Sequence, residues 1–107
     1  QLSVNRGDAE TALPYAEKAN QLLPGNAAIL DTLGWVHHLL GNYEQAEQYL
    51  RESVLAGESA GAWTHLAATQ IELGEMSDAE ASLRRAEELS PDEEIRAKIE
   101  EYRARLR

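Results

Sequence analysis

The sequence contains no cysteine and no phenylalanine, and it has only three prolines among 107 residues. Without cysteine the chain cannot form disulfides or bind zinc through thiolates, so nothing can be inferred about its redox compartment. The scarcity of proline and the abundance of Ala, Leu and Glu favour helix, because these residues lose least on entering one. A chain of this length has room for one hydrophobic core. We therefore expect a single, mainly helical domain.

Basic residues are also scarce: ten Lys and Arg stand against nineteen Asp and Glu, which gives a net charge of −9. A duplex-binding protein needs a basic face to displace counterions from phosphates, so we expect no nucleic-acid partner. Direct contact with an anionic membrane surface is disfavoured for the same reason. Residues 1–91 hold fourteen acids and five bases, whereas residues 92–107 hold five of each. A partner that is steered by electrostatics should therefore be basic.

Long apolar runs are absent too, and the first residues lack the basic-then-apolar pattern of a signal peptide. The sequence begins with Gln1 rather than Met, which suggests a segment excised from a larger protein. Its cellular location cannot be read from these residues, and both the bacterial cytoplasm and the cell envelope are compatible with them.

What the sequence does contain is an internal repeat. Three segments that begin with glycine align with one another: GDAETALPYAEKANQLLP from Gly7, GNYEQAEQYLRESVLAGE from Gly41 and GEMSDAEASLRRAEELSP from Gly74. The glycines are 34 and 33 residues apart, and an alanine follows five residues after each of them. A period of this length is typical of stacked helical repeats.

Two further stretches, one upstream of the second glycine and one upstream of the third, match each other. They are Leu30-x-x-Leu33-Gly34-x-x-His37 and Trp63-x-x-Leu66-Ala67-x-x-Gln70. With the alanines and with Pro24 and Pro91, they resemble the tetratricopeptide-repeat family, whose pattern is W-x2-L-G-x2-Y, then A-x3-F, then P. The resemblance covers nearly the whole chain and departs from the pattern at His37, Gln70 and Glu58. It implies an all-α superhelix, or solenoid, of helix-turn-helix hairpins.

The spacing of apolar residues supports the same fold without the family. Before Gly41 and Gly74 they recur at three- and four-residue steps, so each stretch carries one apolar helical stripe. Small residues fall where paired helices would approach closely: Gly34, Ala46, Ala67 and Ala79. Helices are expected at residues 8–22, 26–40, 43–56, 60–73, 77–89 and 92–106.

The ends of these helices carry local signals. Pro14 lies inside the first helix and predicts a late start or a mild kink. Ser77 and Ser90 each precede a glutamate by three residues, a pattern that predicts a capping box for the following helix. The last helix has a charged outer face and lacks the alanine-glycine signature, as expected of the solvating helix that ends a repeat array.

These boundaries predict a single domain fragment of four parts: a partial first repeat at 1–26, a second at 27–59, a third at 60–93 and a capping helix at 94–107. Only six residues precede Gly7, so the first helix should lack its full partner and leave apolar surface uncovered at Leu13, Ala16 and Leu23. Such surface tends to find a partner, so weak self-association through this end is expected. The net charge opposes it, and salt should strengthen it.

The family resemblance implies a concave groove in which partner peptides lie. Trp35 could anchor a partner side chain there, since Trp is enriched in interface hot spots; alternatively, it packs on the neighbouring repeat. The expected groove residues are Asp31, Trp35, His38, Leu39, Thr64, His65, Ala68, Ile71, Glu72, Lys98 and Tyr102. Some family members hold a terminal carboxylate with Lys and Asn on these faces, and that clamp is absent here.

The sequence contains few residues that could support catalysis. His37 and His38 diverge by about 100° on a helix and cannot share an ion. His38 and His65 could face one groove near Glu72, but the sequence offers no second shell for a metal. His37 is expected to be a hydrogen-bonded core histidine. Because no nucleophile motif, phosphate loop or metal-ligand spacing is present, we expect no enzyme activity, no cofactor and no metal.

Three functions remain open at this point. The leading hypothesis is a protein-protein interaction scaffold that presents a groove to a peptide or helix of a partner. A second is a structural or self-association segment, and a third is a regulatory segment of a larger protein whose enzyme domain lies elsewhere. The segment LDTLGWV, followed by GNYEQAE, looks like segments of bacterial tetratricopeptide arrays, including lipoproteins of exopolysaccharide and protein-sorting systems.

Overall fold

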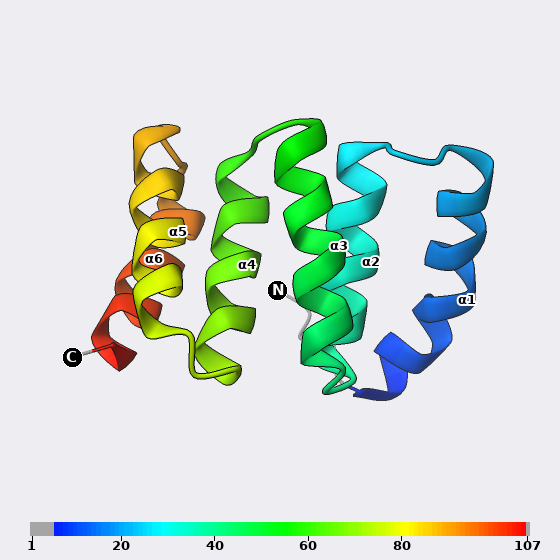
Figure 1. The fold of residues 1–107 in the computed structure, drawn as a ribbon, viewed down its shortest axis with the longest axis horizontal. Helices are drawn as coiled ribbons and strands as arrows, with labels where there is room; N and C mark the ends of the chain where they lie inside the picture. The colour runs from blue at the N-terminus through cyan, green and yellow to red at the C-terminus, as the bar shows by residue number, and fades with distance from the viewer. Residues whose placement is uncertain (1–5, 107) are drawn as a thin grey trace.

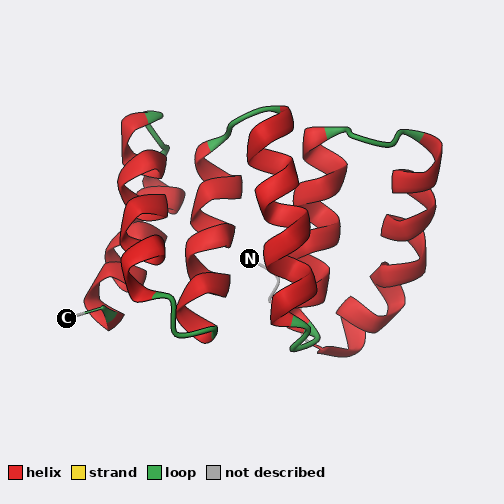
Figure 2. Ribbon diagram, viewed as in Figure 1, coloured by secondary structure: helices red, strands yellow, loops and turns green. Residues whose placement is uncertain are grey.

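A computed structural model describes residues 6–106, which form six α-helices and no strand (Figures 1 and 2). The helices are α1 (Arg6–Leu22), α2 (Ala27–Leu39), α3 (Tyr43–Ala56), α4 (Ala60–Glu72), α5 (Met76–Glu88) and α6 (Glu93–Arg105). Every helix end lies within two residues of the boundary that the sequence predicts. The predicted all-α solenoid is therefore confirmed.

The helices form two layers. α2 pairs with α3, α4 pairs with α5, and α6 packs against both α4 and α5. In Figure 1, α3 lies in front of α2 and α5 in front of α6. In the back layer α2 contacts α4 and α4 contacts α6, whereas within residues 6–106 α3 packs directly against neither α1 nor α5. The closer spacing of α2, α4 and α6 places this layer on the concave side of the stack.

Small residues set the distance between paired helices. A Cβ added at Gly34 in α2 would lie 2.6 Å from Cγ of Leu50 and 3.2 Å from the carbonyl oxygen of Ala46, both in α3. Leu50 and Ala46 are completely buried. In the next hairpin Ala67 and Ala79 are equally buried and belong to one core cluster. The small positions recognised in the sequence are thus where the helices meet.

Glycines end both concave-layer helices that lead into a tight turn. Gly41 and Gly74 have φ angles of +82° and +78°, a left-handed conformation that is costly for residues with a Cβ. The following amides bond back into the helix, Asn42 N to the His37 oxygen and Glu75 N to the Gln70 oxygen, each at 2.8 Å. The predicted glycine turns are therefore present.

Both predicted capping boxes are wrong. Ser77 lies inside α5, because Glu75 already occupies the N-cap position of that helix. Ser90 has a φ of +55° and does not cap α6; instead the Asp92 carboxylate accepts a hydrogen bond from the Ile95 amide at 2.9 Å. Aspartate is as good an N-cap as serine, and Asp92 directly precedes the first helical residue.

The first helix starts early and bends. α1 begins at Arg6 and contains Pro14, so the late start that proline allowed does not occur. Figure 1 shows α1 changing direction along its length, in agreement with the other expectation, a kink. Proline has no amide to donate to the preceding turn, which accounts for the bend.

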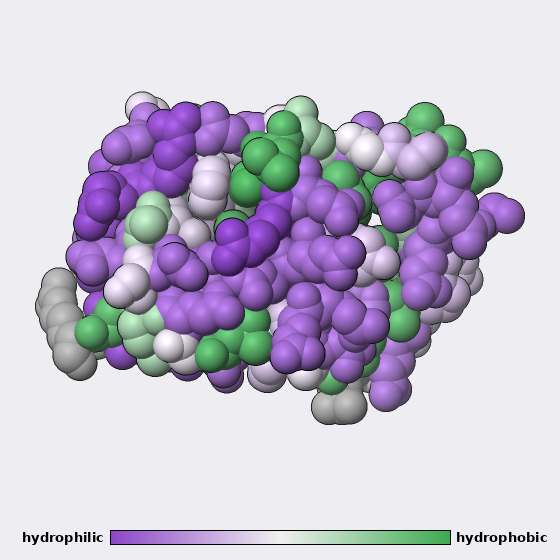
Figure 3. All heavy atoms as spheres, viewed as in Figure 1, coloured by the Kyte–Doolittle hydropathy of each residue, from purple (hydrophilic) through white to green (hydrophobic). Residues whose placement is uncertain are grey.

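The apolar surface near α1 differs from the prediction. Ala16 is buried and Leu13 packs in the cluster around Val36, because both residues are on the side of α1 that meets α2. Only Leu23 is exposed, together with Tyr15 and Leu22. Figure 3 shows apolar surface at this end of the molecule. None of the helices between residues 6 and 106 is both long and apolar enough to span a membrane.

Candidate protein-binding surface

Trp35 lies between two imidazole rings on the concave layer. Its ring stacks on His38 of α2 at a centroid distance of 4.3 Å and on His65 of α4 at 4.1 Å, with interplanar angles of 8° and 19°. Both faces of the indole are therefore covered, and Trp35 packs on the neighbouring hairpin. A partner could reach only the edge of this half-buried ring.

Two hydrogen bonds tie the stack to the adjacent helix. His65 Nδ1 is 2.8 Å from Oδ1 of Asp31, and His38 Nδ1 is 3.0 Å from the Thr69 hydroxyl oxygen. The Thr69 hydroxyl donates its single proton to the His65 carbonyl oxygen at 3.0 Å, so it must accept a proton from His38. His38 therefore carries its proton on Nδ1, and α2 is joined to α4 through both histidines.

The environment of His38 keeps it neutral. Burial lowers the pKa of this imidazole to about 4, although the nearby Glu72 carboxylate opposes the shift. At neutral pH the ring is an uncharged hydrogen-bond donor to Thr69. No group of three His, Asp or Glu side chains in the described part of the chain could hold a metal ion.

His37 has the role that the sequence predicts for it. The ring is buried, its Nδ1 lies 3.3 Å from the side-chain nitrogen Nδ2 of Asn42, and it stacks on Tyr49 at a centroid distance of 5.5 Å. Burial lowers the pKa of His37 below its ordinary value. It is a core histidine on the opposite side of α2 from the stack.

The concave layer continues to α6 through an ion pair. Arg105 Nη2 lies 3.0 Å from Oε2 of Glu72, which links α6 to α4. Lys98 is exposed on α6 and pairs with Glu101 at 3.5 Å. Tyr102 turns inward and is buried.

The structure divides the eleven expected groove residues into four groups. Thr64, Ala68, Ile71 and Tyr102 are buried and support the surface from beneath. Asp31, Trp35, His38 and His65 come together in the stack, while Glu72 and Lys98 are exposed on α4 and α6. Leu39 instead packs in the cluster that contains Val36 and Leu40.

Two residues near the stack were missed by the sequence reasoning. Thr69 holds His38, and the Tyr43 ring meets His38 edge-on at 5.2 Å. Thr69 follows His65 by four residues, and residues four apart lie on the same face of a helix. The spacing alone could therefore have placed Thr69 beside the stack. Tyr43 comes from the next helix, and only the fold brings it to His38.

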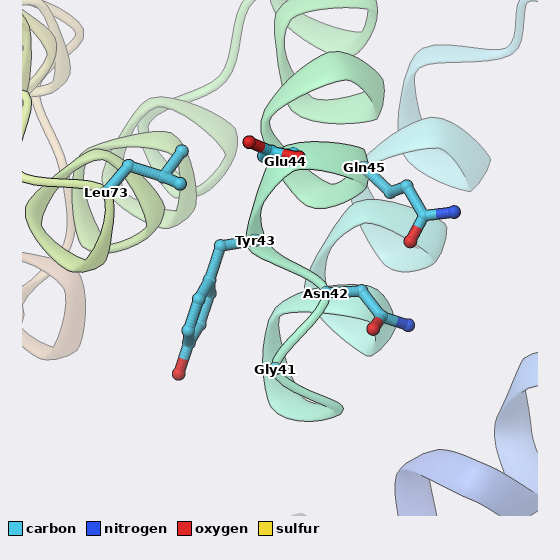
Figure 4. Close-up of a pocket in the computed structure, with 6 residues that line it drawn as sticks. All are labelled: Gly41, Asn42, Tyr43, Glu44, Gln45 and Leu73. Carbon is cyan, nitrogen blue, oxygen red and sulfur yellow. The ribbon is translucent and has the colours of Figure 1, made fainter.

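A hollow of about 400 Å³ opens beside Tyr43. Its lining residues are Gly41, Asn42, Tyr43, Glu44, Gln45 and Leu73. Figure 4 shows Leu73 reaching toward α3 from the next hairpin, while Asn42 and Gln45 point to the other side. Because Tyr43 also contacts His38, this hollow adjoins the aromatic stack.

The opposite face explains one departure from the repeat pattern. Glu58 stands where the pattern has proline, and its carboxylate accepts two hydrogen bonds from the Arg85 guanidinium at 2.6 Å each. It also accepts one from Trp63 Nε1 at 3.0 Å. The hydrogen bonds from Arg85 and Trp63 lower the pKa of Glu58. This residue therefore connects the loop before α4 to α5.

A protein-family model supports the repeat interpretation. The model described as "Anaphase-promoting complex, cyclosome, subunit 3" matches residues 5–86. Among curated proteins, anaphase-promoting complex subunit 6 of Dictyostelium discoideum is 40% identical over 45 residues. The aligned stretch covers 42% of this chain but only 5% of that protein.

Two solved structures resemble the fold closely. A thermophilic TPR protein of Thermus thermophilus matches with a TM-score of 0.77 at 24% identity, over 91% of this chain and 50% of that one. The TPR domain of Arabidopsis OM64 matches with a TM-score of 0.79 at 20% identity, over 92% of this chain and 84% of that one. At these identities the likeness concerns the fold alone.

Proposed function

Since the chain belongs to the anaphase-promoting complex, cyclosome, subunit 3 family and has the tetratricopeptide-repeat fold, we propose that it is a protein-binding scaffold whose concave face receives a peptide or helix of a partner. The observation that carries the proposal is the concave layer itself. It presents the edge of Trp35, the polar groups of Asp31 and His65, and the hollow beside Tyr43 on one continuous surface.

The proposed partner is basic. The chain has a net charge of −9, and Glu72 adds a partly exposed carboxylate to the concave face. A positively charged segment would be attracted over distances of about 8–10 Å at moderate salt. Lys98 and Arg105 lie at the α6 end, so the acidic part of the surface is nearer α2 and α4. We place the basic residues of the partner there.

A second function has its own supporting observation. An apolar hollow of about 400 Å³ lies between α1 and α2, near the exposed Tyr15. Its lining residues are Ala12, Tyr15, Ala16, Ala19, Ala28, Ile29 and Thr32. This surface supports the alternative of a structural or self-association segment. A regulatory segment of a larger protein would use the same surface to contact its neighbouring domain.

The finer divisions also stand as proposals. We propose repeat units at residues 1–26, 27–59 and 60–93, followed by a capping helix at 94–107. We also propose a resemblance to bacterial tetratricopeptide lipoproteins of exopolysaccharide and protein-sorting systems. It is supported by the amino-acid sequence of residues 30–36 and 41–47.

A random-peptide display library selected against the 107-residue chain would test the scaffold proposal. Enriched peptides would be titrated against the chain and against Glu72→Lys, in which a concave carboxylate changes sign. The matched control is Glu52→Lys, which makes the same change at an exposed position on α3. We expect basic peptides that lose affinity with Glu72→Lys and keep it with Glu52→Lys.

Two results would refute the scaffold proposal. One is a selection that yields no peptide with measurable affinity. The other is a set of peptides that loses affinity equally with both variants, because overall charge rather than the concave face would then determine binding.

A further inference from the structure

The convex side of the second and third hairpins is bridged by side chains alone. α3 and α5 do not pack directly on one another within residues 6–106, and a hollow of about 350 Å³ lies between them. The hollow is lined by Arg51, Trp63, Leu66, Gln70, Asp78, Ala81, Ser82 and Arg85. Figure 3 shows the face of the molecule on which α3 and α5 lie. The two hairpins meet directly through α3 and α4, and side chains that span this gap join α5 and the turn before it to α3.

Two bridges span the gap. The first is the pair of Glu58 and Arg85 described above. The second involves Glu47 and Arg51 of α3 and Glu75 in the turn before α5. Arg51 Nη2 lies 2.8 Å from Oε2 of Glu47 but 4.0 Å from Oε1 of Glu75. That Glu75 oxygen is buried and has no hydrogen-bond partner, so Arg51 neutralises Glu47 much better than Glu75.

The Glu47 and Glu75 carboxyl groups interact, and the interaction favours a proton on Glu75. The hydrogen bond with Glu47 is the main cause that raises the pKa of Glu75 to about 7, and burial and the charge of Glu47 add to it. Burial acts to raise the pKa of Glu47, but hydrogen bonds from Glu75, Arg51 and Gln70 outweigh it and lower that pKa. Of the two carboxyl groups, Glu75 is therefore the one that keeps its proton to higher pH.

The groups around the pair come from three elements. Asp78 of α5 also raises the pKa of Glu75, and Arg51 of α3 lowers it. Gln70 of α4 is buried, hydrogen-bonds to Glu47 and accepts a hydrogen bond from the Ser82 hydroxyl at 2.7 Å. Glu47 and Glu75 thus share one guanidinium that pairs mainly with Glu47, and Asp78 adds a further negative charge nearby. A proton on Glu75 relieves this excess of negative charge.

We propose that Glu47 and Glu75 form a proton-dependent clasp that ties the turn before α5 to α3. With the proton present, the turn before α5 is held against α3. When the proton is lost, two neighbouring carboxylates repel each other between α3 and the turn before α5, and α3 and α5 have no direct packing to oppose this repulsion. The turn then moves away from α3 and the convex hollow widens. The clasp does not depend on peptide binding to the concave face.

The direction of the pH effect follows from the two end states. The ordinary pKa of a glutamate is 4.5, whereas in the folded chain Glu75 releases its proton only near pH 7. Stabilisation by the clasp is therefore complete below about pH 4.5 and is lost as the pH rises through about 7. The clasp opens within the range in which most cells operate.

Carboxyl NMR of the whole 107-residue chain would test the clasp directly. We expect the Glu75 carboxyl carbon to titrate near 7, and its pKa to fall by at least about one unit in Glu47→Gln, since one unit corresponds to a tenfold change in proton affinity. Exchange of the Glu75 and Ala79 amides, which bond to the Gln70 and Glu75 oxygens, should accelerate as the pH rises through 7, after correction for intrinsic rates.

The variant Glu75→Gln keeps a hydrogen-bond donor toward Glu47 but cannot titrate. Its corrected amide exchange should be independent of pH through this range, whereas the control Glu52→Gln should behave as the unaltered chain. A Glu75 that titrates near 4.5 in the unaltered chain would overturn the proposal. The same pH-dependent exchange in Glu75→Gln as in the unaltered chain would overturn it as well.

Discussion

A Cβ at position 34 would lie 2.6 Å from Cγ of Leu50, closer than such carbon atoms approach in proteins. Leu50 is completely buried, so it cannot yield without disturbing its neighbours. We expect Gly34→Ala to destabilise the chain by about 1–3 kcal/mol, as overpacked cores do, although alanine favours helix. Urea unfolding would measure the change.

Gly61 provides the matched control, because it is also helical and an added Cβ there meets only Ile95 Cδ1 at 3.8 Å. Gly61→Ala should leave stability unchanged or raise it by up to about 1 kcal/mol. Equal urea midpoints for Gly34→Ala and Gly61→Ala would show that the hairpin is not closed by the small residue.

The same helix contact can be tested from the alanine positions. Ala46 and Ala79 are completely buried, one in each hairpin. Replacing either residue by leucine should force the paired helices apart and cost about 1–3 kcal/mol. Ala81→Leu is the control, since Ala81 is exposed on α5. If both buried variants unfold at the midpoint of the unaltered chain, the packing account is wrong.

His38 should make stability depend on pH on the acidic side. Its pKa falls from 6.5 to about 4 on folding, because burial disfavours the charged ring. The unfolded chain therefore binds the proton first, and stabilisation that is present above pH 6.5 is lost as the pH falls toward 4. The loss should be on the order of 2–3 kcal/mol. Urea unfolding at stepped pH would measure it.

The double variant His38→Phe with Thr69→Val serves as the control, because it removes both the titrating ring and its buried partner. Its stability should fall less steeply between pH 6.5 and 4. A His38 ring that titrates near 6.5 by NMR would contradict this explanation.

Two substitutions distinguish the roles of Asp92 and Ser90 at the start of α6. Asp92→Ala removes the carboxylate that caps the Ile95 amide and should cost about 1 kcal/mol. Ser90→Gly should stabilise the chain by about 1 kcal/mol, because Ser90 has a positive φ that glycine adopts without strain. Thermal unfolding of both variants would show opposite shifts. A destabilising Ser90→Gly would restore Ser90 as the cap.

The sequence was sufficient for the fold because the repeat signals are local. Gly41 and Gly74 end helices, and small residues such as Gly34 and Ala46 mark where helices touch; both kinds of signal recur in register. The capping prediction at Ser90 failed because Asp92 and Ser90 are both good caps, and only the path of the chain decides between them. Local chemistry could not choose one.

The candidate surface was less predictable. The helical faces of Trp35 and His65 could be assigned from periodicity, but not the stacking that covers both sides of the indole. Thr64 and Tyr102 share those faces and yet are buried; Tyr102 packs into a core cluster with residues of α4 and α5. The interaction of Glu47 with Glu75 joins residues that are distant in sequence, and no spacing rule points to it.

The central claim is that the concave layer binds a protein segment. The most direct measurement is amide chemical-shift mapping of the isotope-labelled chain with a peptide selected from the random library. We expect the largest shifts on α2, α4 and α6, including Asp31, His65 and Glu72. Shifts confined to α3 and α5, or to the apolar hollow between α1 and α2, would contradict the claim.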